Sequence, residues 1–434
     1  MRYFILNYFS KNLSVLDYKK YLNFKYILTF SSLNYLQSGI SFLVSILLAR
    51  ELGKQDFGYF SYGLIFANTI STLMQFGTDR TLVRDLVQLK DPPVVLSSAA
   101  WIWFTLGSII TLGATIWAVL FSDLDYTAAL IVAACSCLGF VRGMSVMPWF
   151  DYKGKANYHS IIMLGDRVLF LCFAIVIIFF FKNEKAVIYV SFAQLATRIL
   201  ALSMEWRFVL KSTRLNFKPV YESIKKIISD NVWVWLAGIG NLLMTQANQL
   251  ILNEKFGAEE LANYGLAIQV IAIIRLLQTQ LQRLTAPSIA SVTADTNDAG
   301  EILRKLFRFC GLTFLLSLGI ILPAYFLTPF VIEKFIGAQY LSAIPVLNVL
   351  YAWSLLYGVA IIINQFLIGL RLQRFFFVST AVFGLLSLVL AEFFVDRYKA
   401  MGAAISLLIA HFCSVVFQFL IVLKKIKSNA QPNS

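Results

Sequence analysis

The chain has 434 residues, of which 59% are hydrophobic and only 14% are charged. Its mean hydropathy is +0.73. Soluble globular proteins carry about 25% charged residues, so this composition excludes a water-soluble protein with an ordinary surface. The net charge of +14 does not indicate nucleic-acid binding, because the basic residues lie between apolar runs, as the positive-inside rule requires.

The first 25 residues are basic and aromatic and have no cleavage site made of small residues. They are therefore not typical of a signal peptide. We expect the segment Tyr3–Tyr26 to lie on the cytoplasmic face of a membrane as an interfacial segment.

Twelve apolar runs follow, each long enough to cross about 30 Å of hydrocarbon as a helix. The predicted spans are 26–49, 57–78, 96–121, 126–147, 160–181, 186–206, 232–252, 261–282, 309–331, 341–369, 375–395 and 400–423. No stretch of about 60 residues lacks such a run. The fold class is therefore an all-α integral membrane protein without a separate aqueous domain.

The distribution of Lys and Arg predicts the orientation. With the N-terminus inside, 26 of the 37 basic residues fall in inside segments, eight fall in outside loops and three lie within spans. Every inside segment is basic. This bias predicts that both termini are cytoplasmic.

The longest inside loop, 207–231, divides the chain into two lobes of six helices, 26–206 and 232–423, with a cytoplasmic tail at 424–434. The loop that joins spans one and two can be aligned with the loop that joins spans seven and eight by placing Gly53 on Gly257. The offset is 204 residues. Because both halves start inside, they are expected to be related by a pseudo-two-fold axis along the membrane normal.

Polar residues form a stripe on span one and another on span seven, at the same offset. Gln37, Ser41 and Ser45 correspond to Asn241, Thr245 and Gln249, and Asn34 lies one turn before Gln37. Positions four apart share one helix face. The two stripes either line a wet central cleft or form hydrogen bonds between helices.

Four arginines lie at a similar depth in the inner half of the membrane, roughly 11 Å from the inner end of their spans. They are Arg142, Arg167, Arg198 and Arg275. An Arg inside a membrane normally faces protein or water. One interpretation is a cationic cavity that binds a phosphate-bearing substrate, since the planar guanidinium can bond two oxygens. The alternatives are snorkelling to the inner surface and, for Arg198, an ion pair with Asp166.

No motif for catalysis or metal binding stands out. The chain has no phosphate-binding loop of the GxxxxGK[ST] type. The two histidines have no evident partners, and the five cysteines fall in or beside apolar runs, as packing residues do. We expect a non-enzyme without catalytic residues, cofactor or metal. A membrane-embedded glycan polymerase is disfavoured because no outside loop exceeds about ten residues.

Several short motifs together resemble a known family. They are LARELGKQDFGY at 48–59, QFGTDRTLVR at 75–84, PWFDYKG at 148–154, IGAQYLSA at 336–343 and MGAAI at 401–405. The chain resembles the polysaccharide transporters of the multidrug/oligosaccharidyl-lipid/polysaccharide flippase superfamily, which include the O-antigen (Wzx-type) flippases. The resemblance covers most of the chain.

This resemblance implies alternating access by two lobes, which moves an undecaprenyl-diphosphate-linked oligosaccharide to the outer leaflet of the bacterial inner membrane. Spans one, two, seven and eight would border the cavity, so Arg80 and Arg275 become candidate ligands of the diphosphate. Arg142, Arg167 and Arg198 are weaker candidates. The sugars would meet four amides, Asn34, Gln37, Asn241 and Gln249.

Asp166 is the candidate for proton or sodium coupling. We expect a monomer whose partners are the lipid-linked oligosaccharide and membrane lipids, with a polysaccharide polymerase and chain-length machinery as candidate protein partners. The nearest alternative is a multidrug exporter of the same superfamily. It would need acidic groups in its cavity, whereas the charges that lie away from the span ends are three arginines, Arg167, Arg198 and Arg275, and one aspartate, Asp166.

Overall fold

A computed structural model provides the three-dimensional description of the chain. It describes residues 24–88, 91–122, 124–181, 185–213, 219–295, 298–370 and 372–430. Within these ranges every regular element is a helix, which confirms the all-α class. The predicted interfacial segment Tyr3–Tyr26 lies outside the described residues, except that its last three residues begin the first helix.

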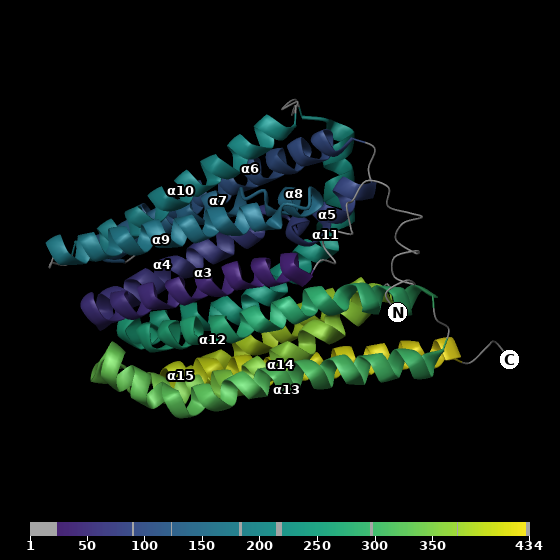
Figure 1. Cartoon of the computed structure of the whole chain (residues 1–434). Helices are drawn as coiled ribbons and strands as arrows, with labels where there is room; N and C mark the ends of the chain where they lie inside the picture. The colour runs from purple at the N-terminus through teal and green to yellow at the C-terminus, as the bar shows by residue number, and fades with distance from the viewer. Residues whose placement is uncertain are drawn as a thin grey trace. The chain divides into compact units, whose positions relative to one another are not determined.

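The long helices overlap the predicted spans. The helices are α3 (Phe24–Glu51), α4 (Lys54–Met74), α5 (Thr78–Gln88), α6 (Pro92–Ile116), η1 (Trp117–Phe121), α7 (Tyr126–Gly143), α8 (Met147–Tyr152), α9 (Ala156–Phe180), α10 (Ala186–Ser212), α11 (Tyr221–Leu242), η2 (Leu243–Ala247), α12 (Asn248–Asp295), α13 (Ala299–Val331), η3 (Ile332–Ile336), η4 (Ala338–Tyr340), α14 (Ala343–Gly369) and α15 (Gln373–Ala430) (Figure 1). Two of them, α11 and α13, begin about ten residues earlier than predicted.

Nine helical stretches in the described part of the chain are long and apolar enough to cross a membrane. Two of them, 62 and 56 residues long, are longer than one crossing needs. Each contains one residue with non-helical backbone angles, Gly257 in α12 and Lys399 in α15. Both residues lie where the hydropathy pattern predicts an outside loop. The count of twelve spans remains a prediction.

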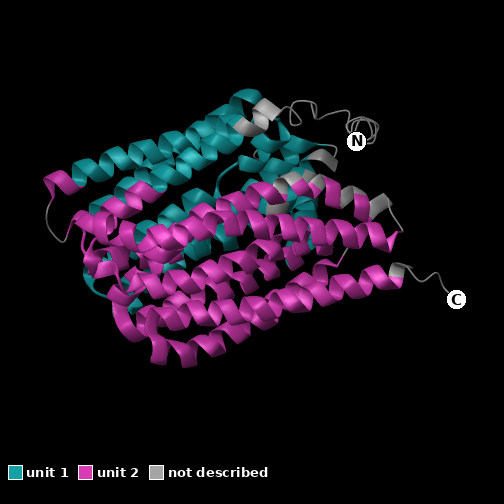
Figure 2. Ribbon diagram, turned by 60° about the horizontal axis from the view of Figure 1, so that its bottom comes forward, with its two compact units in different colours: residues 1–41, 66–177, 188–232 teal, residues 42–65, 178–187, 233–434 magenta. Residues whose placement is uncertain are grey.

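The chain forms two compact units (Figure 2). Unit 1 comprises residues 1–41, 66–177 and 188–232, and unit 2 comprises residues 42–65, 178–187 and 233–434. The segments 42–65 and 178–187, which belong to the first predicted lobe, are therefore part of unit 2. The lobe boundaries remain a prediction.

In unit 1 the helices are held by small residues and by a capped helix start. Asp91 caps α6, since its carboxylate accepts a hydrogen bond from the backbone N–H of Val94 at 3.4 Å. On α7, a Cβ at Gly139 would lie 2.6 Å from the carbonyl oxygen of Ala67 on α4. Small residues allow helix backbones in membranes to approach this closely.

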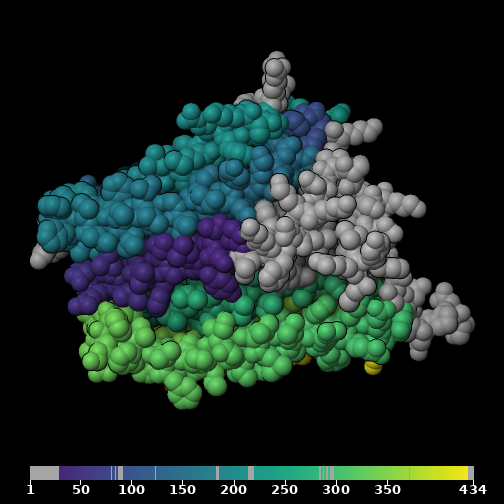
Figure 3. Space-filling view, in the orientation of Figure 1, coloured from purple at the N-terminus to yellow at the C-terminus, as the bar shows by residue number. Residues whose placement is uncertain are grey.

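In unit 2 the central helix is α14, which packs against α12, α13 and α15. Its buried residues Ile362 and Phe366 join a core with Leu306 of α13 and Val422 of α15. The outer surface of α13, green in Figure 3, is rich in exposed large apolar side chains. Phe326 is 72% exposed. Such a surface is stable against lipid and unstable against water.

The 204-residue repeat has local counterparts in the structure. Gly53 and Gly257, which the alignment pairs, both adopt left-handed backbone angles, with φ of 83° and 74°. The hydroxyl of Ser41 donates to the carbonyl oxygen of Gln37 at 2.9 Å, and the hydroxyl of Thr245 donates to that of Asn241 at 2.8 Å. Each stripe therefore contains an equivalent hydrogen bond, from a hydroxyl to the carbonyl oxygen four residues earlier. They differ in backbone, because η2, a π-helix, interrupts only the second.

Gly58 lies at the tightest backbone contact within unit 2. A Cβ at this position would lie 1.9 Å from the carbonyl oxygen of Ala258. We expect Gly58→Ala to destabilise the protein by about 1–3 kcal/mol, as overpacking does, and to lower its melting temperature in detergent. The control is Gly113→Ala on α6, where no atom lies within 4 Å of the added carbon. An equal melting temperature for the two variants would contradict this prediction.

Candidate functional site

Arg275 lies on α12 in unit 2, beside two aromatic side chains of α14. Its Nη2 donates a hydrogen bond to the hydroxyl of Tyr357 at 3.1 Å. Its guanidinium carbon lies 4.4 Å from the ring centroid of Tyr357 and 5.5 Å from that of Trp353. Both distances are within the range of cation–π attraction. The aromatic rings hold the cation in place without neutralising it.

His411, on α15, packs against the rings of Trp353 and Tyr357. Its ring centroid lies 6.0 Å from that of Trp353 and 6.0 Å from that of Tyr357. Its Nδ1 lies 3.4 Å from the sulfur of Met244. Met244 belongs to η2, and single-turn π-helices within α-helices are frequent at functional sites. We name Arg275, Trp353, Tyr357 and His411 the cation–aromatic cluster.

Arg275 keeps most of its hydrogen-bonding capacity. A guanidinium has five N–H donors, and the Tyr357 hydroxyl accepts one of them. Within the described part of the chain, no carboxylate forms an ion pair with Arg275. The side chain is only half-buried. The remaining donors can therefore bind an oxyanion, for which the planar fork of arginine is well suited.

The four amide side chains predicted to contact the sugars differ in the hydrogen bonds that they already form within the protein. The amide nitrogen of Gln249 is already used within its own helix, by the carbonyl oxygen of Thr245 at 2.8 Å and the side-chain oxygen of Gln246 at 3.2 Å. Asn34 accepts a hydrogen bond from Ser160 of α9 at 3.4 Å.

Gln37 and Asn241 remain available to a ligand. The structure gives neither amide side chain a hydrogen bond within the described residues. Both side chains are half-buried. These two amides fit a sugar-binding role better than Gln249 does.

The charged cluster of unit 1 is built around Glu205, which is not among the site residues predicted from the sequence. Glu205 is fully buried. It accepts hydrogen bonds from the hydroxyl of Ser145 at 2.8 Å and the backbone N–H of Val146 at 3.0 Å. Its Oε1 lies 3.4 Å from Nη2 of Arg198 and 3.9 Å from Nδ1 of His159. The carboxylate thus joins α10 to the turn between α7 and α8.

The alternative interpretation that pairs Arg198 with Asp166 is wrong. Arg198 pairs with Glu205 and also contacts the sulfur of Met163. Asp166 forms its ion pair with the neighbouring Arg167, at 3.9 Å. Asp166 is also not the sole carboxylate buried in the membrane-spanning helices, since Glu205 is another.

Three of the predicted arginines come together in unit 1. Arg142, Arg167 and Arg198 lie near enough to one another to interact electrostatically. Arg142 also donates a hydrogen bond to the side-chain oxygen of Asn68 at 3.3 Å. Arg80 lies on α5, but its side chain is outside the described residues. Arg167 and Arg198 each pair with a carboxylate, Asp166 and Glu205, in contrast to Arg275, although their Nε atoms have no hydrogen-bond partner among the described residues.

The fold by itself is typical of one class of protein, the membrane transporters. It is a bundle of long apolar helices with buried charges and no aqueous domain in the described residues, as in membrane transporters. Several solved structures share this fold, and two of them illustrate it. One is "Lipid II flippase MurJ, inward closed conformation", with a TM-score of 0.70 and 13% identity over 93% of this chain and 90% of that chain.

The other solved structure is a multidrug resistance MATE family transporter of the MOP superfamily in its inward-facing conformation. Its TM-score is 0.71, with 13% identity over 92% of this chain and 96% of that chain. A curated relative from Shigella flexneri, "Putative O-antigen transporter", is 22% identical over 389 residues, which are 83% of this chain and 88% of that protein.

The family described as "Polysaccharide biosynthesis protein" matches residues 24–281, more than half of the chain. The chain belongs to this family. It is a multi-pass protein of the bacterial inner membrane, and its relatives are named as transporters and flippases. The family resemblance stated from the motifs is confirmed.

Proposed function

We propose that this protein is a flippase. It carries an undecaprenyl-diphosphate-linked oligosaccharide, such as an O-antigen repeat unit, from the inner to the outer leaflet of the inner membrane by alternating access. Twelve spans in two lobes of six helices, with both termini cytoplasmic, would form the transport path. Membership in the polysaccharide biosynthesis family supports the substrate class.

The observation that carries the proposal is Arg275 in the cation–aromatic cluster. It is a half-buried cation on a membrane-spanning helix with no carboxylate partner in the described part of the chain. A diphosphate would supply the missing negative charge, and charge-assisted hydrogen bonds to phosphate are about twice as strong as neutral ones. Arg80 is proposed as a second diphosphate ligand, and Gln37 and Asn241 as contacts to the sugars.

A drug exporter is the second candidate, because the MATE transporter shares the fold. We expect a drug exporter of this superfamily to expel cations. Its cavity should therefore present acidic groups that are not paired with arginines. The buried carboxylates Glu205 and Asp166 are instead paired with arginines. The charge pattern therefore favours an anionic substrate.

The test uses cells that lack the gene for this protein. We expect loss of surface polysaccharide and accumulation of the lipid-linked oligosaccharide, both reversed by the intact gene. In vesicles with the purified protein, a fluorescent undecaprenyl-diphosphate sugar should become accessible to a reagent on the opposite side. Normal polysaccharide in the deleted cells, together with increased sensitivity to cationic drugs, would favour the exporter instead.

The proposed orientation can be tested with single cysteines at exposed positions. Asp125 precedes α7 and Lys155 precedes α9, and both are exposed. We expect Asp125→Cys to react with a membrane-impermeant maleimide in intact cells, and Lys155→Cys to react only after permeabilisation. The wild-type protein, with its five cysteines, provides the background signal. The reverse pattern would invert the orientation.

A further inference from the structure

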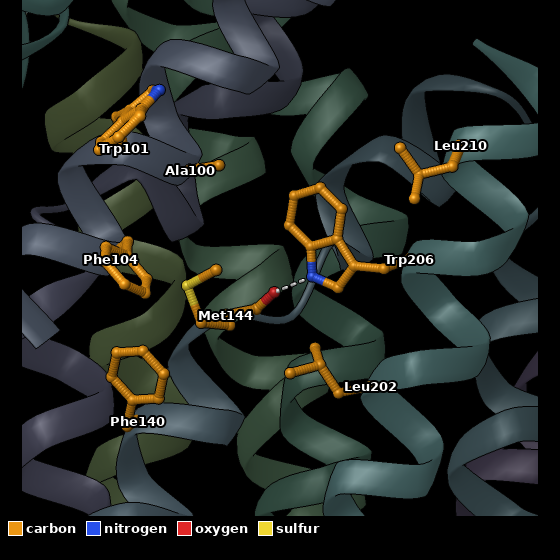
Figure 4. A pocket seen from close by; sticks show the side chains of 8 residues that line it. All are labelled: Ala100, Trp101, Phe104, Phe140, Met144, Leu202, Trp206 and Leu210. Carbon is orange, nitrogen blue, oxygen red and sulfur yellow. Dashed lines mark hydrogen bonds between the residues drawn. The ribbon is translucent and has the colours of Figure 1, made fainter. Parts of the chain in front are cut away.

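Unit 1 contains an apolar groove that shares no residue with the cation–aromatic cluster. Its volume is about 530 Å³. The lining comes from α6, α7 with the residue that follows it, and α10, and no lining side chain is charged (Figure 4). The lining residues are Ala100, Trp101, Phe104, Phe140, Met144, Leu202, Trp206 and Leu210.

The walls of the groove are held in place by specific contacts. The indole N–H of Trp206 donates to the carbonyl oxygen of Met144 at 3.1 Å, which joins α10 to the end of α7 (Figure 4). The ring of Phe104 meets the rings of Trp101 and Phe140 edge to face, at centroid distances of 6.4 Å and 6.0 Å. Such geometry is favourable for aromatic pairs. The groove is therefore a built surface.

The groove is open to the surroundings of the helices. Phe104 is 51% exposed and Leu210 is 49% exposed. Since α6, α7 and α10 are long and apolar enough to cross a membrane, lipid is the medium that suits these exposed apolar side chains. An empty groove would forfeit the dispersion contacts of its lining atoms, so a hydrocarbon chain should fill it. Tryptophans such as Trp101 and Trp206 are enriched where the hydrocarbon meets the headgroups.

Two exposed basic residues on α10 are sequence neighbours of residues that line the groove. Arg207 and Lys211 are exposed and directly follow Trp206 and Leu210. They lie in the segment that the Lys and Arg distribution predicts to be cytoplasmic. Juxtamembrane basic residues attract the anionic lipids of that leaflet, and their long side chains can reach the headgroup level. The apolar groove and the two charges together match an amphipathic, negatively charged ligand.

We propose that this groove binds an anionic phospholipid of the cytoplasmic leaflet. One acyl chain would lie among the aromatic side chains, and the phosphate would contact Arg207 and Lys211. This site does not depend on the proposed flippase function, because its lining belongs to unit 1 and includes no residue of the cation–aromatic cluster, and because it would hold a resident lipid.

The test measures lipid retention by the purified full-length protein with native mass spectrometry. Phosphatidylglycerol and phosphatidylcholine are added in equal amounts. We expect selective retention of phosphatidylglycerol, about tenfold weaker in the double variant Arg207→Gln/Lys211→Gln. The matched control is Lys225→Gln/Lys226→Gln, which removes two exposed charges from α11 and should retain phosphatidylglycerol like the wild type.

A second measurement reports on the groove itself. Phosphatidylglycerol with brominated acyl chains should quench part of the fluorescence of the eight tryptophans. Trp206→Phe should lower the quenched fraction, and Leu202→Trp, which fills the groove, should lower lipid retention severalfold. Both changes leave Arg207 and Lys211 intact.

Three results would overturn the proposal. The first is equal loss of phosphatidylglycerol in the two double variants, which would indicate unspecific attraction. The second is unchanged quenching in Trp206→Phe together with unchanged retention in Leu202→Trp. The third is displacement of phosphatidylglycerol by an equal amount of undecaprenyl phosphate, which would assign the groove to the tail of the substrate.

Discussion

Replacement of Arg275 by alanine should reduce substrate binding by about 30- to 100-fold, which corresponds to about 2–3 kcal/mol. The reason is that the guanidinium is aligned by Tyr357 and Trp353 yet keeps donors for a diphosphate. Arg275→Lys should retain part of the binding, because an ammonium keeps the charge but loses the planar fork. Binding of the lipid-linked oligosaccharide by purified protein measures the effect.

The same variants should be compared in cells. Arg275→Ala should lower surface polysaccharide and raise the pool of lipid-linked oligosaccharide. The matched control is Arg374→Ala, because Arg374 also lies over an aromatic ring, Trp233, at 5.8 Å, but is exposed at the start of α15. Arg374→Ala should leave both quantities near wild type. Full activity of Arg275→Ala at normal expression would remove Arg275 from the substrate site.

Replacement of Glu205 by alanine should have the largest effect on stability, about 3–5 kcal/mol, as expected when one partner of a buried ion pair is removed. The substitution leaves Arg198 without its carboxylate in a buried position. It also deprives Ser145 and Val146 of their hydrogen-bond acceptor. Glu205→Gln should cost less, since an amide oxygen can still accept one of these bonds.

Thermal unfolding in detergent measures this difference. The control is Glu392→Ala, which removes a carboxylate from an exposed ion pair with Lys255. Its melting temperature should stay near that of the wild type, because exposed pairs contribute little to stability. If Glu205→Ala unfolds at the same temperature as Glu392→Ala, the buried cluster is not a stabilising feature of unit 1.

The ion pair between Arg198 and Glu205 was not predicted from the sequence. Arg198 and Asp166 were matched by their expected depth on neighbouring helices. Glu205 lies near the inner end of the predicted span 186–206, whereas α10 continues to Ser212 and Glu205 is fully buried. Arg198 and Glu205 are seven residues apart on α10, which places them on one helix face. That spacing was an available signal.

The cation–aromatic cluster could be predicted only in part. Arg275 was found because an arginine within an apolar run is costly and needs a reason. Trp353 and Tyr357 are four residues apart on α14 and so lie on one face, but nothing in their spacing relates them to Arg275. His411 was set aside for want of a partner, and its neighbours Met244, Trp353 and Tyr357 come from other helices.

Hydropathy alone was sufficient to predict an all-helical membrane protein and the approximate position of its long apolar helices, but not the short helices α5 and α8. Hydrocarbon offers no hydrogen bonds to the backbone, so each apolar run must satisfy its own amide groups as a helix. The pairing of side chains was decided only by tertiary packing. Arg275 contacts Tyr357, 82 residues away in the sequence, because α12 and α14 pack together. Which helices pack together depends on how the side-chain ridges of one fit the grooves of the other.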